Sequence, residues 1–373
     1  MTEKTDTKDE TGVETGGATS RRRFLSGGLA AGGAAMAAGF VAAKPAAADG
    51  ESVIAEVQDW NRYLGDGVVS QPYGVPSRFE ANVVRRDVEW LTASRESSVS
   101  FTPLHELDGI ITPNGLCFER HHGGTAQIEP SQHRLMINGL VDTPLVFTMQ
   151  DLMRFPRENH VYFLECAANS GMEWRGAQLN GCQYTHGMVH CVVYTGVKLK
   201  HLLAEAGVKT NGKWILAEGA DSAAMTRSIP LEKALDDCMV AFKMNGEALR
   251  PEQGYPVRLV VPGWEGNMWV KWLRRLEVGD QPWQQREETS KYTDLLANGK
   301  ARRFTWVMDV KSVITSPSPQ APIRHGRGKA VISGLAWSGN GKIKRVDVSI
   351  DHNNGIQTWY VKADGTVENV EVS

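Results

Sequence analysis

Apolar residues recur with the helical period in one segment of the chain. Positions i, i+3, i+4 and i+7 of this segment are apolar: Leu199, Leu202, Leu203 and Ala206. Such a stripe predicts an amphipathic helix, and Gly207 directly after it predicts where the helix ends. The run PVRLVVPG at residues 256–263 is instead apolar at nearly every position, which predicts a buried strand.

Two shorter helices are predicted from their start signals. In TPLVFTMQDLMRFP, the end of a strand is followed by a short helix that Thr148 caps. In SIPLEKALDD, we expect Ser228 to cap a helix that has Pro230 in its first turn. Because these helices alternate with strands, a mixed α/β domain is predicted for residues 101–301.

The last part of the chain, residues 302–373, has the period of strands. Apolar and polar residues alternate in VDVSI at residues 346–350, and turn residues in DHNNGIQ and ADGT separate further short strands. An immunoglobulin-like β-sandwich is predicted, so the expected fold class is α+β: a mixed α/β domain followed by a sandwich. About seventy residues is short of the roughly one hundred of such a domain, so we expect a truncated or incomplete sandwich.

The N-terminus has the pattern of an export signal. SRRRFL at residues 20–25 precedes a Gly/Ala-rich apolar run, which ends in the small-residue site Ala46-Ala47-Ala48. The run is too short and too rich in glycine to span a bilayer stably, and the paired arginines match the twin-arginine signal. We expect residues 1–48 to direct export of the folded chain to the periplasm, and residues 49–100 to form a polar, extended arm.

Composition and charge narrow the classes of function. The chain is 41% hydrophobic and 23% charged, with a net charge of −2, so its charge does not indicate a nucleic acid or an anionic membrane surface as partner. About 325 residues remain after the signal, enough for one large or two ordinary domains. The 11 tryptophans suit a large core and a walled pocket.

The cysteine count is odd, so at least one thiol is unpaired or used chemically. The five are Cys117, Cys166, Cys182, Cys191 and Cys238. No C-x-x-C pair supports a zinc ribbon or a dithiol redox motif, and no C-x-x-C-H motif supports covalent c-type haem. Cys166 closes an apolar run and opens a polar turn, a usual place to present a reactive side chain. From these residues alone, four roles are open for Cys166: one half of a disulfide, a buried core residue, a nucleophile or a metal ligand.

Three other motifs are incomplete. His186 and His190 have the spacing of a zinc-binding helix but lack the glutamate base, so we expect satisfied polar histidines. Residues 207–213 contain most of a phosphate-binding loop, yet Trp214 replaces the required Ser or Thr, which indicates a helix C-cap and turn. No G-x-S-x-G sequence supports a serine hydrolase.

Five separated blocks resemble, in the right order, the sulfite oxidase family of molybdenum–pterin enzymes. They lie within roughly residues 101–360: CFERHH from Cys117, LECAANS around Cys166, VYTGVKLKHLLAEAG, EGADS with SIPLEKALDD, and MNGEALRPEQGYPVRLVVPGWEGNMWVKWLRRLEV. The piece GLAWSGNGKIKRVDVSID also resembles the dimerisation domain of the family. Within the family, the chain is most similar to molybdenum subunits of sulfane dehydrogenases.

The resemblance implies a molybdenum–molybdopterin cofactor. Cys166 falls at the thiolate that binds molybdenum, and a soft thiolate suits a transition metal with sulfur co-ligands. Arg120, His121 and His122 fall where the family holds the pterin and the oxo face of the metal, and Arg120 would also point at an anionic substrate. The contacts to the pterin and its phosphate fall on three further positions: Asp221, Arg258 and Lys271.

Several positions depart from sulfite-oxidising relatives. Gly171 stands where they carry a second arginine, and Met225 stands where they carry an active-site tyrosine. Tyr184 replaces a pocket tryptophan, Gln253 replaces a pterin-contacting histidine, and Lys342 aligns with an arginine near the W-S-G turn. A pocket without the arginine and the tyrosine holds a small dianion less well. It suits sulfur delivered on a longer, less charged arm.

The resemblance thus implies a molybdenum oxidoreductase with Arg120, Cys166 and Tyr184 as its catalytic residues. We expect it to oxidise persulfide sulfur on a carrier protein during thiosulfate oxidation. Because the chain has no haem motif, the electrons would pass to a c-type cytochrome subunit, in a homo-oligomer or heterotetramer without a membrane span. The alternative reaction is that of a sulfite:cytochrome c oxidoreductase, and the alternative of another class is a non-catalytic exported binding or structural protein.

Overall fold

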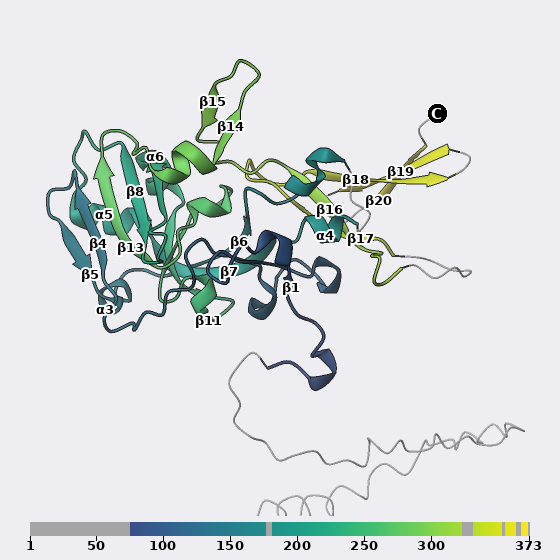
Figure 1. Ribbon diagram of the computed structural model, residues 1–373, viewed down its shortest axis with the longest axis horizontal. Coiled ribbons are helices and arrows are strands. Elements are labelled where there is room, and N and C mark those ends of the chain that lie inside the picture. Colours follow the sequence, from purple (N-terminus) through teal and green to yellow (C-terminus); the bar gives the residue numbers. More distant parts are fainter. Residues whose placement is uncertain (1–74, 177–180, 323–330, 353–354, 363–366, 372–373) are drawn as a thin grey trace, which may run out of the picture. The chain divides into compact units, whose positions relative to one another are not determined.

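The computed structural model describes residues 75–176, 181–322, 331–352, 355–362 and 367–371 (Figure 1). The export signal expected at residues 1–48 lies outside the described residues, as do the turn positions 353–354 and 363–366. Among the described residues, no helix is both long enough and apolar enough to cross a membrane.

Two five-stranded sheets form the larger part of the structure. The first has the order β11-β10-β7-β6, with β12 also paired to β10: β6 (Glu158–Glu165), β7 (Val189–Lys198), β10 (Met239–Met244), β11 (Glu247–Ala248) and β12 (Arg258–Val260). The second has the order β5-β4-β13-β8-β9: β4 (Leu135–Gly139), β5 (Leu145–Phe147), β8 (Trp214–Gly219), β9 (Thr226–Pro230) and β13 (Leu273–Gly279). The β4–β13 pair is parallel and the other pairs are antiparallel.

Short helices connect these strands: α3 (Met149–Leu152), α4 (Cys182–Thr185), α5 (Leu199–Ala206) and α6 (Leu231–Asp236). The predicted stripe is confirmed, because all four of its apolar side chains on α5 are buried. Gly207 ends α5 with φ of 70°, a value that favours glycine, so residues 207–213 begin as a helix C-cap, as predicted. Thr148 caps α3 in a capping box with Asp151, which is also confirmed.

The predicted start of the helix in SIPLEKALDD is wrong. Ser228 lies inside β9, where its hydroxyl donates to the carbonyl of Trp283, and Pro230 is the N-cap residue of α6 rather than part of its first turn. The serine therefore has a tertiary partner and does not bind the helix N-terminus. Because β9 runs directly into α6, no residue between them is left to cap the helix with a polar side chain.

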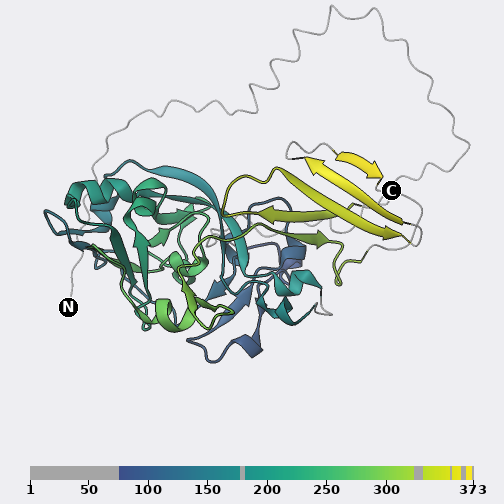
Figure 2. The same ribbon diagram turned by 90° about the horizontal axis from the view of Figure 1, so that it is seen from above.

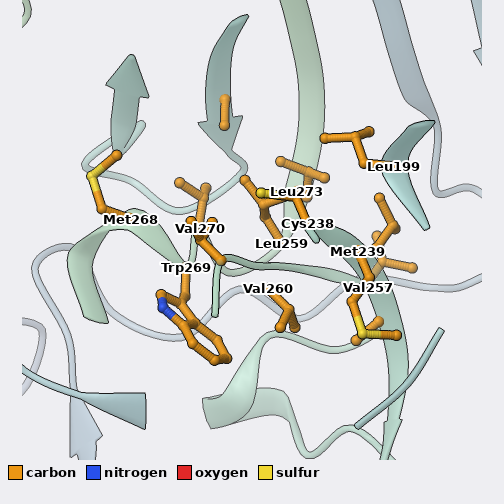
Figure 3. Close-up of a cluster of buried hydrophobic side chains, with 14 of the residues drawn as sticks. Leu199, Cys238, Met239, Val257, Leu259, Val260, Met268, Trp269, Val270 and Leu273 are labelled. Carbon is orange, nitrogen blue, oxygen red and sulfur yellow. The ribbon is translucent and has the colours of Figure 1, made fainter. Parts of the chain in front are cut away.

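The buried strand predicted at PVRLVVPG is β12, and it lies in the core of the protein. Leu259 and Val260 are fully buried, and Figure 3 shows them among side chains from neighbouring elements, including Met239 and Trp269. Burying such side chains contributes roughly 1.5–3 kcal/mol each. Since Arg258 belongs to the same strand, this packing fixes a charged side chain inside the protein.

The part of the predicted arm that the structure describes joins the body of the protein. It contributes to a three-stranded sheet of order β1-β2-β3: β1 (Arg86–Asp87), β2 (Val99–Phe101) and β3 (Glu119–Arg120). Val99 and Phe101 are buried. The predicted boundary between residues 100 and 101 therefore lies within β2, because apolar side chains on both of its sides belong to the core.

The C-terminal part consists of antiparallel strands: β14 (Thr293–Leu295), β15 (Ala301–Arg303), β16 (Lys311–Ser316), β17 (Ser333–Trp337), β18 (Arg345–His352), β19 (Gly355–Lys362) and β20 (Val367–Glu371). They form the pairs β14–β15 and β16–β17 and the three-stranded sheet β18-β19-β20, drawn in yellow in Figure 2. Val346 and Val348 are half-buried while Asp347 is exposed, so the predicted alternation is confirmed at these positions.

Candidate active site

Cys166 lies directly after the last residue of β6, at the strand-to-loop junction that the sequence predicts. Its N–H donates to the carbonyl of Met188 over 3.0 Å, and its own carbonyl accepts the N–H of Asn169 over 2.9 Å. All five cysteines are free, so the disulfide interpretation is wrong. Burial raises the pKa of the Cys166 thiol, so without a metal it stays protonated; a bound metal ion would remove the proton.

One pocket contains Cys166 and every residue predicted to bind the cofactor. The predicted residues that line it are Arg120, His121, His122, Cys166, Asp221, Arg258 and Lys271. They come from β3 and β12 and from the loops after β3, after β6, after β8 and before β13, so residues up to 151 positions apart in the chain share one cavity, such as Arg120 and Lys271. Met225 and Gln253 line it as well, at the places where the sequence predicted altered pocket positions.

Arg258 is the most buried cation of the pocket. Its side chain on β12 is 2% exposed, and burial lowers its pKa. Nη1 donates to the carbonyl of Gln253 over 3.1 Å and Nη2 to that of Trp269 over 3.0 Å, but Nε has no partner among the described residues. A buried guanidinium held only by neutral acceptors lacks a counter-charge, and an anionic group in the pocket would supply it.

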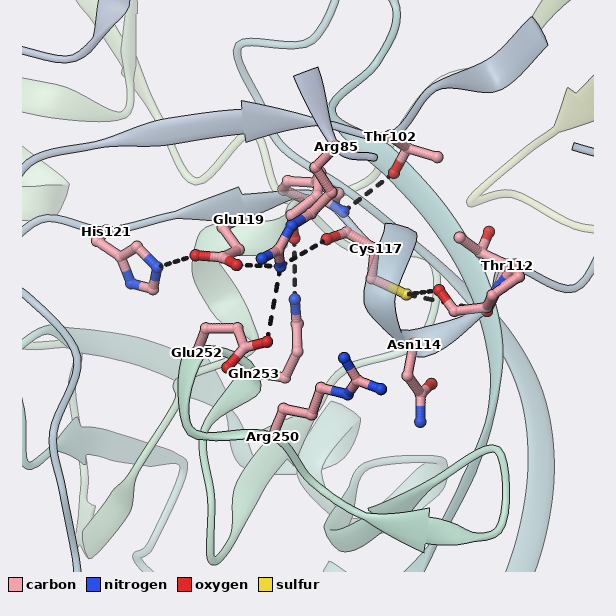
Figure 4. Close-up of polar contacts among 12 residues, drawn as sticks. Arg85, Thr102, Thr112, Asn114, Cys117, Glu119, His121, Arg250, Glu252 and Gln253 are labelled. Carbon is pink, nitrogen blue, oxygen red and sulfur yellow. Dashed lines mark hydrogen bonds and ion pairs between the residues drawn. The ribbon is translucent and has the colours of Figure 1, made fainter. Parts of the chain in front are cut away.

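Lys271 is tied to the pocket wall through His121. Nζ of Lys271 lies 3.0 Å from Nδ1 of His121, which therefore acts as acceptor, and Nε2 of His121 lies 2.9 Å from Oε2 of Glu119. Figure 4 shows Glu119 next to Arg85, which also faces Glu252. Burial, followed by Arg258, lowers the pKa of Lys271 to about 7. A phosphate would restore its charge.

Arg85 reaches this network from the predicted N-terminal arm, and no pattern in the sequence indicates this contact. Arg85 forms an ion pair with Glu119 and lies 3.6 Å from Glu252. An arginine in a polar segment is usually a solvated surface charge. Only the tertiary contacts show that the arm supports two residues of the pocket wall, Glu119 and Glu252.

Tyr292 is a pocket residue that the sequence did not predict. It follows a π-helical turn (Glu287–Lys291) and lines the pocket, and its hydroxyl lies 3.1 Å from Nε2 of His122. The Cζ atom of Arg227 lies 5.1 Å from the centre of its ring. Burial raises the pKa of the Tyr292 phenol, so it stays protonated and can donate.

Asp221 shapes the turn between β8 and β9 as well as the pocket wall. Its Oδ1 accepts the N–H of Met225 over 3.0 Å, and both side chains line the pocket. The carboxylate is thus held by the backbone N–H of Met225, which is expected to stand where sulfite-oxidising relatives carry a tyrosine. This arrangement fits a polar contact to a heterocycle, as the sequence predicted for Asp221.

Tyr184, Gly171 and Lys342 have other surroundings. Among the described residues that line the pocket, none of the three is found. Tyr184 on α4 packs under the Arg86 guanidinium, 3.6 Å from ring centre to Cζ, and its hydroxyl accepts from Nε1 of Trp90 over 3.3 Å. Lys342 is exposed.

The two histidines of the incomplete zinc motif have separate partners. Nδ1 of His186 lies 3.0 Å from the carbonyl of Cys182, and Nε2 of His190 lies 3.2 Å from the hydroxyl of Tyr194. Within the described part of the chain, no three His, Cys, Asp or Glu side chains gather to hold a metal ion. A metal bound at Cys166 would therefore take most of its ligands from a non-protein group.

Two family models match the chain. The oxidoreductase molybdopterin binding domain matches residues 122–287, and the Mo-co oxidoreductase dimerisation domain matches residues 302–369. The mitochondrial sulfite oxidase of Mus musculus is 32% identical over 271 residues, 68% of this chain and 49% of that protein. The sulfite oxidase of Gallus gallus is 32% identical over 67% of this chain and 58% of that protein. The chain thus spans about half the length of these curated relatives.

One solved structure matches this chain over nearly the full length of the solved chain. The crystal structure of the sulfane dehydrogenase SoxCD from Paracoccus pantotrophus has 54% sequence identity and a TM-score of 0.77, covering 86% of this chain and 99% of that one. The pocket agrees with the family cofactor: it holds one buried thiol, the buried Arg258 without a counter-charge, and Lys271, with polar side chains around them. The chain therefore belongs to the sulfite oxidase family of molybdopterin-binding oxidoreductases.

Proposed function

We propose that this chain is the molybdenum subunit of a sulfane dehydrogenase that oxidises sulfur bound to a carrier protein. The observation that carries the proposal is the 54% identity to SoxCD over 99% of that chain. The pocket supports the same substrate class, because the apolar Met225 lines it and because Gly171 cannot supply the second cation expected in sulfite-oxidising relatives. A persulfide on a protein arm needs this room, whereas sulfite needs charges close by.

The pocket residues divide into two groups by what they would hold. Cys166 would bind the metal, while Arg258 and Lys271 would bind the phosphate of the pterin, with His121 and Asp221 against its polar edge. When bound, a molybdenum–pterin centre supplies oxygen-atom transfer to sulfur and accepts two electrons. The protein positions Lys271 and Arg258 before the cofactor binds, because hydrogen bonds to backbone carbonyls already hold both side chains.

Arg120 and the Tyr292–His122 pair would act on the substrate. Arg120 would attract the anionic end of a persulfide, because this residue lines the pocket that contains Cys166. Each oxygen added to sulfur comes from water, and this releases two electrons and two protons. The imidazole of His122, whose pKa burial lowers to about 4, is neutral, so its Nε2 can accept the hydrogen bond of the Tyr292 hydroxyl and hold this hydroxyl in the pocket wall.

The electrons need an acceptor outside this chain, which has no C-x-x-C-H motif. We propose a c-type cytochrome subunit as the acceptor, assembled with this chain in an oligomer, and a sulfur-carrier protein as the substrate. The arginine pair and apolar run at the N-terminus support periplasmic export by the twin-arginine route. The Mo-co dimerisation domain matched at residues 302–369 supports contact between subunits.

Anaerobic reduction distinguishes the two possible substrates. Molybdenum-loaded protein is mixed with excess sulfite or with a carrier protein loaded with persulfide, and the metal is followed by absorption and EPR. Reduction by the persulfide carrier, with sulfite leaving the metal oxidised, supports the proposal. Rapid reduction by sulfite would make the protein a sulfite dehydrogenase. A centre that neither donor reduces would favour a non-catalytic role.

A further inference from the structure

Glu165, the residue directly before Cys166, carries a carboxylate that is fully buried. Its exposed fraction is 0%. A charge removed from water needs partners that replace its hydration. Three side chains donate to it: Lys311 Nζ at 2.8 Å and Asn169 Nδ2 at 2.9 Å from Oε1, and Trp337 Nε1 at 2.6 Å from Oε2.

Two of these donors come from the region matched as the dimerisation domain. Lys311 is the first residue of β16, and Trp337 is the last residue of β17. The two are directly opposed partners in the antiparallel pair. Side chains of opposed residues stand close together on one face of a sheet. The β16–β17 pair therefore brings an ammonium and an indole N–H to the two oxygens of a single carboxylate.

The same contacts extend to the turn that presents Cys166. The Asn169 side chain donates to Glu165, and its Oδ1 accepts the N–H of Met188 over 3.0 Å, while the carbonyl of Met188 accepts the N–H of Cys166. Nζ of Lys311 also lies 3.3 Å from the carbonyl of Asn169. The buried carboxylate and the cysteine turn thus form one hydrogen-bonded unit.

We propose that Lys311 and Trp337 are positioning residues for Cys166. Docking of the β16–β17 pair neutralises Glu165 and thereby fixes the turn, so the thiol is held for the metal only while the pair is docked. The consequence for the metal rests on the proposed role of Cys166 as ligand. The position of the thiol itself can be measured in the full-length chain without cofactor.

Two substitutions remove one donor each, and each has a matched control. Lys311→Met removes the ammonium, and Lys342→Met removes an exposed lysine from the same region. Trp337→Phe removes the indole N–H but keeps an aromatic ring. Trp306→Phe removes an indole N–H that has no acceptor among the described residues.

The first readout is the alkylation rate of each cysteine by iodoacetamide, followed by mass spectrometry of the cofactor-free chain. Lys311→Met and Trp337→Phe should each accelerate modification of Cys166 about tenfold, because a buried thiol reacts through local opening of its turn. Modification of the buried Cys117 and Cys238 should stay unchanged. Unchanged Cys166 rates overturn the proposal, and so does equal acceleration of all three thiols, which would report a global loss of stability.

A double-mutant cycle tests the link through the carboxylate. Glu165→Gln removes the charge that requires an ammonium, so adding Lys311→Met to it should change the Cys166 rate little. Fully additive effects would contradict the link. In molybdenum-loaded protein, Lys311→Met and Trp337→Phe should also shift the EPR signal of the metal, whichever donor reduces it. Failure of the substrate proposal therefore leaves the alkylation result intact.

Discussion

The hydroxyl of Tyr292 lies 3.1 Å from Nε2 of His122, in the wall of the pocket that contains Cys166. Burial and the neighbouring Arg120 lower the pKa of His122 to about 4, so the imidazole is neutral near pH 7. The phenol remains protonated because burial raises its pKa. The pair therefore consists of one hydrogen-bond donor and one acceptor in the pocket wall, where the phenol can also face a bound substrate.

Replacing Tyr292 by Phe should lower kcat about 10²-fold while the molybdenum content stays unchanged, because the loss of one positioned hydrogen-bond donor at a reacting centre costs about this much. Steady-state kinetics with the persulfide carrier, together with metal analysis, measures both quantities. Tyr184→Phe is the matched comparison, because Tyr184 has Trp90 rather than a pocket residue at its hydroxyl. A larger loss in Tyr184→Phe would support Tyr184 as the catalytic tyrosine that the sequence predicts.

The stability of the cofactor-free chain should rise with pH above about 7 because of Lys271. Burial lowers its pKa to about 7 in the folded chain, whereas lysine in an unfolded chain has a pKa of about 10.4. Between these values the unfolded state binds more protons, so the free energy of unfolding increases with pH. Thermal unfolding at several pH values measures the slope, which Lys271→Met should reduce. An unchanged slope in that variant would contradict the assignment.

The cofactor should give the opposite dependence on pH. A bound phosphate favours the charged form of Lys271, so retention of the cofactor should be strongest below about pH 7 and weaken as the lysine loses its proton. Dialysis at increasing pH followed by molybdenum analysis tests this. Retention that increases with pH would show that Lys271 does not bind an anion.

Cys166→Ser should abolish sulfur oxidation and change the EPR signal of any molybdenum that remains, because a hydroxyl is a harder and less acidic ligand than a thiol. The fold should persist, since the substitution is nearly isosteric. Cys117→Ser is the control: Cys117 is also buried, and its Sγ lies 3.5 Å from the carbonyl of Pro113, which a hydroxyl can also contact. Normal sulfur oxidation by Cys166→Ser protein would remove the basis for a molybdenum enzyme.

The sequence predicted those elements whose cause is local. The stripe that contains Leu199 and Leu202 predicted α5, because a helix that packs on a core must repeat its apolar side chains every three or four residues. Thr148 predicted the start of α3, because its partner in the helix cap lies only three residues away. The pocket residues were predicted for another reason: they stand inside blocks that resemble a known family, which carries tertiary information that no period contains.

The sequence missed the contacts that only packing creates. Ser228 has the residue type of a helix cap, but Trp283 lies close enough in space to take its hydrogen bonds. Tyr292 follows a π-helical turn, and a repeat of apolar residues does not predict such a turn. Arg85 contacts Glu119 across a sheet that the arm was not expected to form. Each case depends on a partner far away in the sequence, so local patterns could not have revealed it.

Removing the charge of Arg258 should affect folding and cofactor binding in opposite directions. In the cofactor-free chain its guanidinium is buried without a counter-charge, which opposes folding. Arg258→Met should therefore leave the melting temperature of that chain unchanged or raise it, because methionine fills a similar space without a charge. In the loaded protein, the same variant should lose molybdenum and pterin on gel filtration, because the anion loses its most buried partner.

Arg275→Met is the control for this prediction. Arg275 is half-buried on β13, donates to Glu218 over 2.7 Å, and is outside the pocket lining among the described residues. Its loss should lower the melting temperature slightly, by the small contribution of a partly exposed ion pair, and leave cofactor retention unchanged. If Arg258→Met instead destabilised the cofactor-free chain strongly and kept its cofactor, Arg258 would be a structural residue, and the anion site would have to be sought around Lys271 alone.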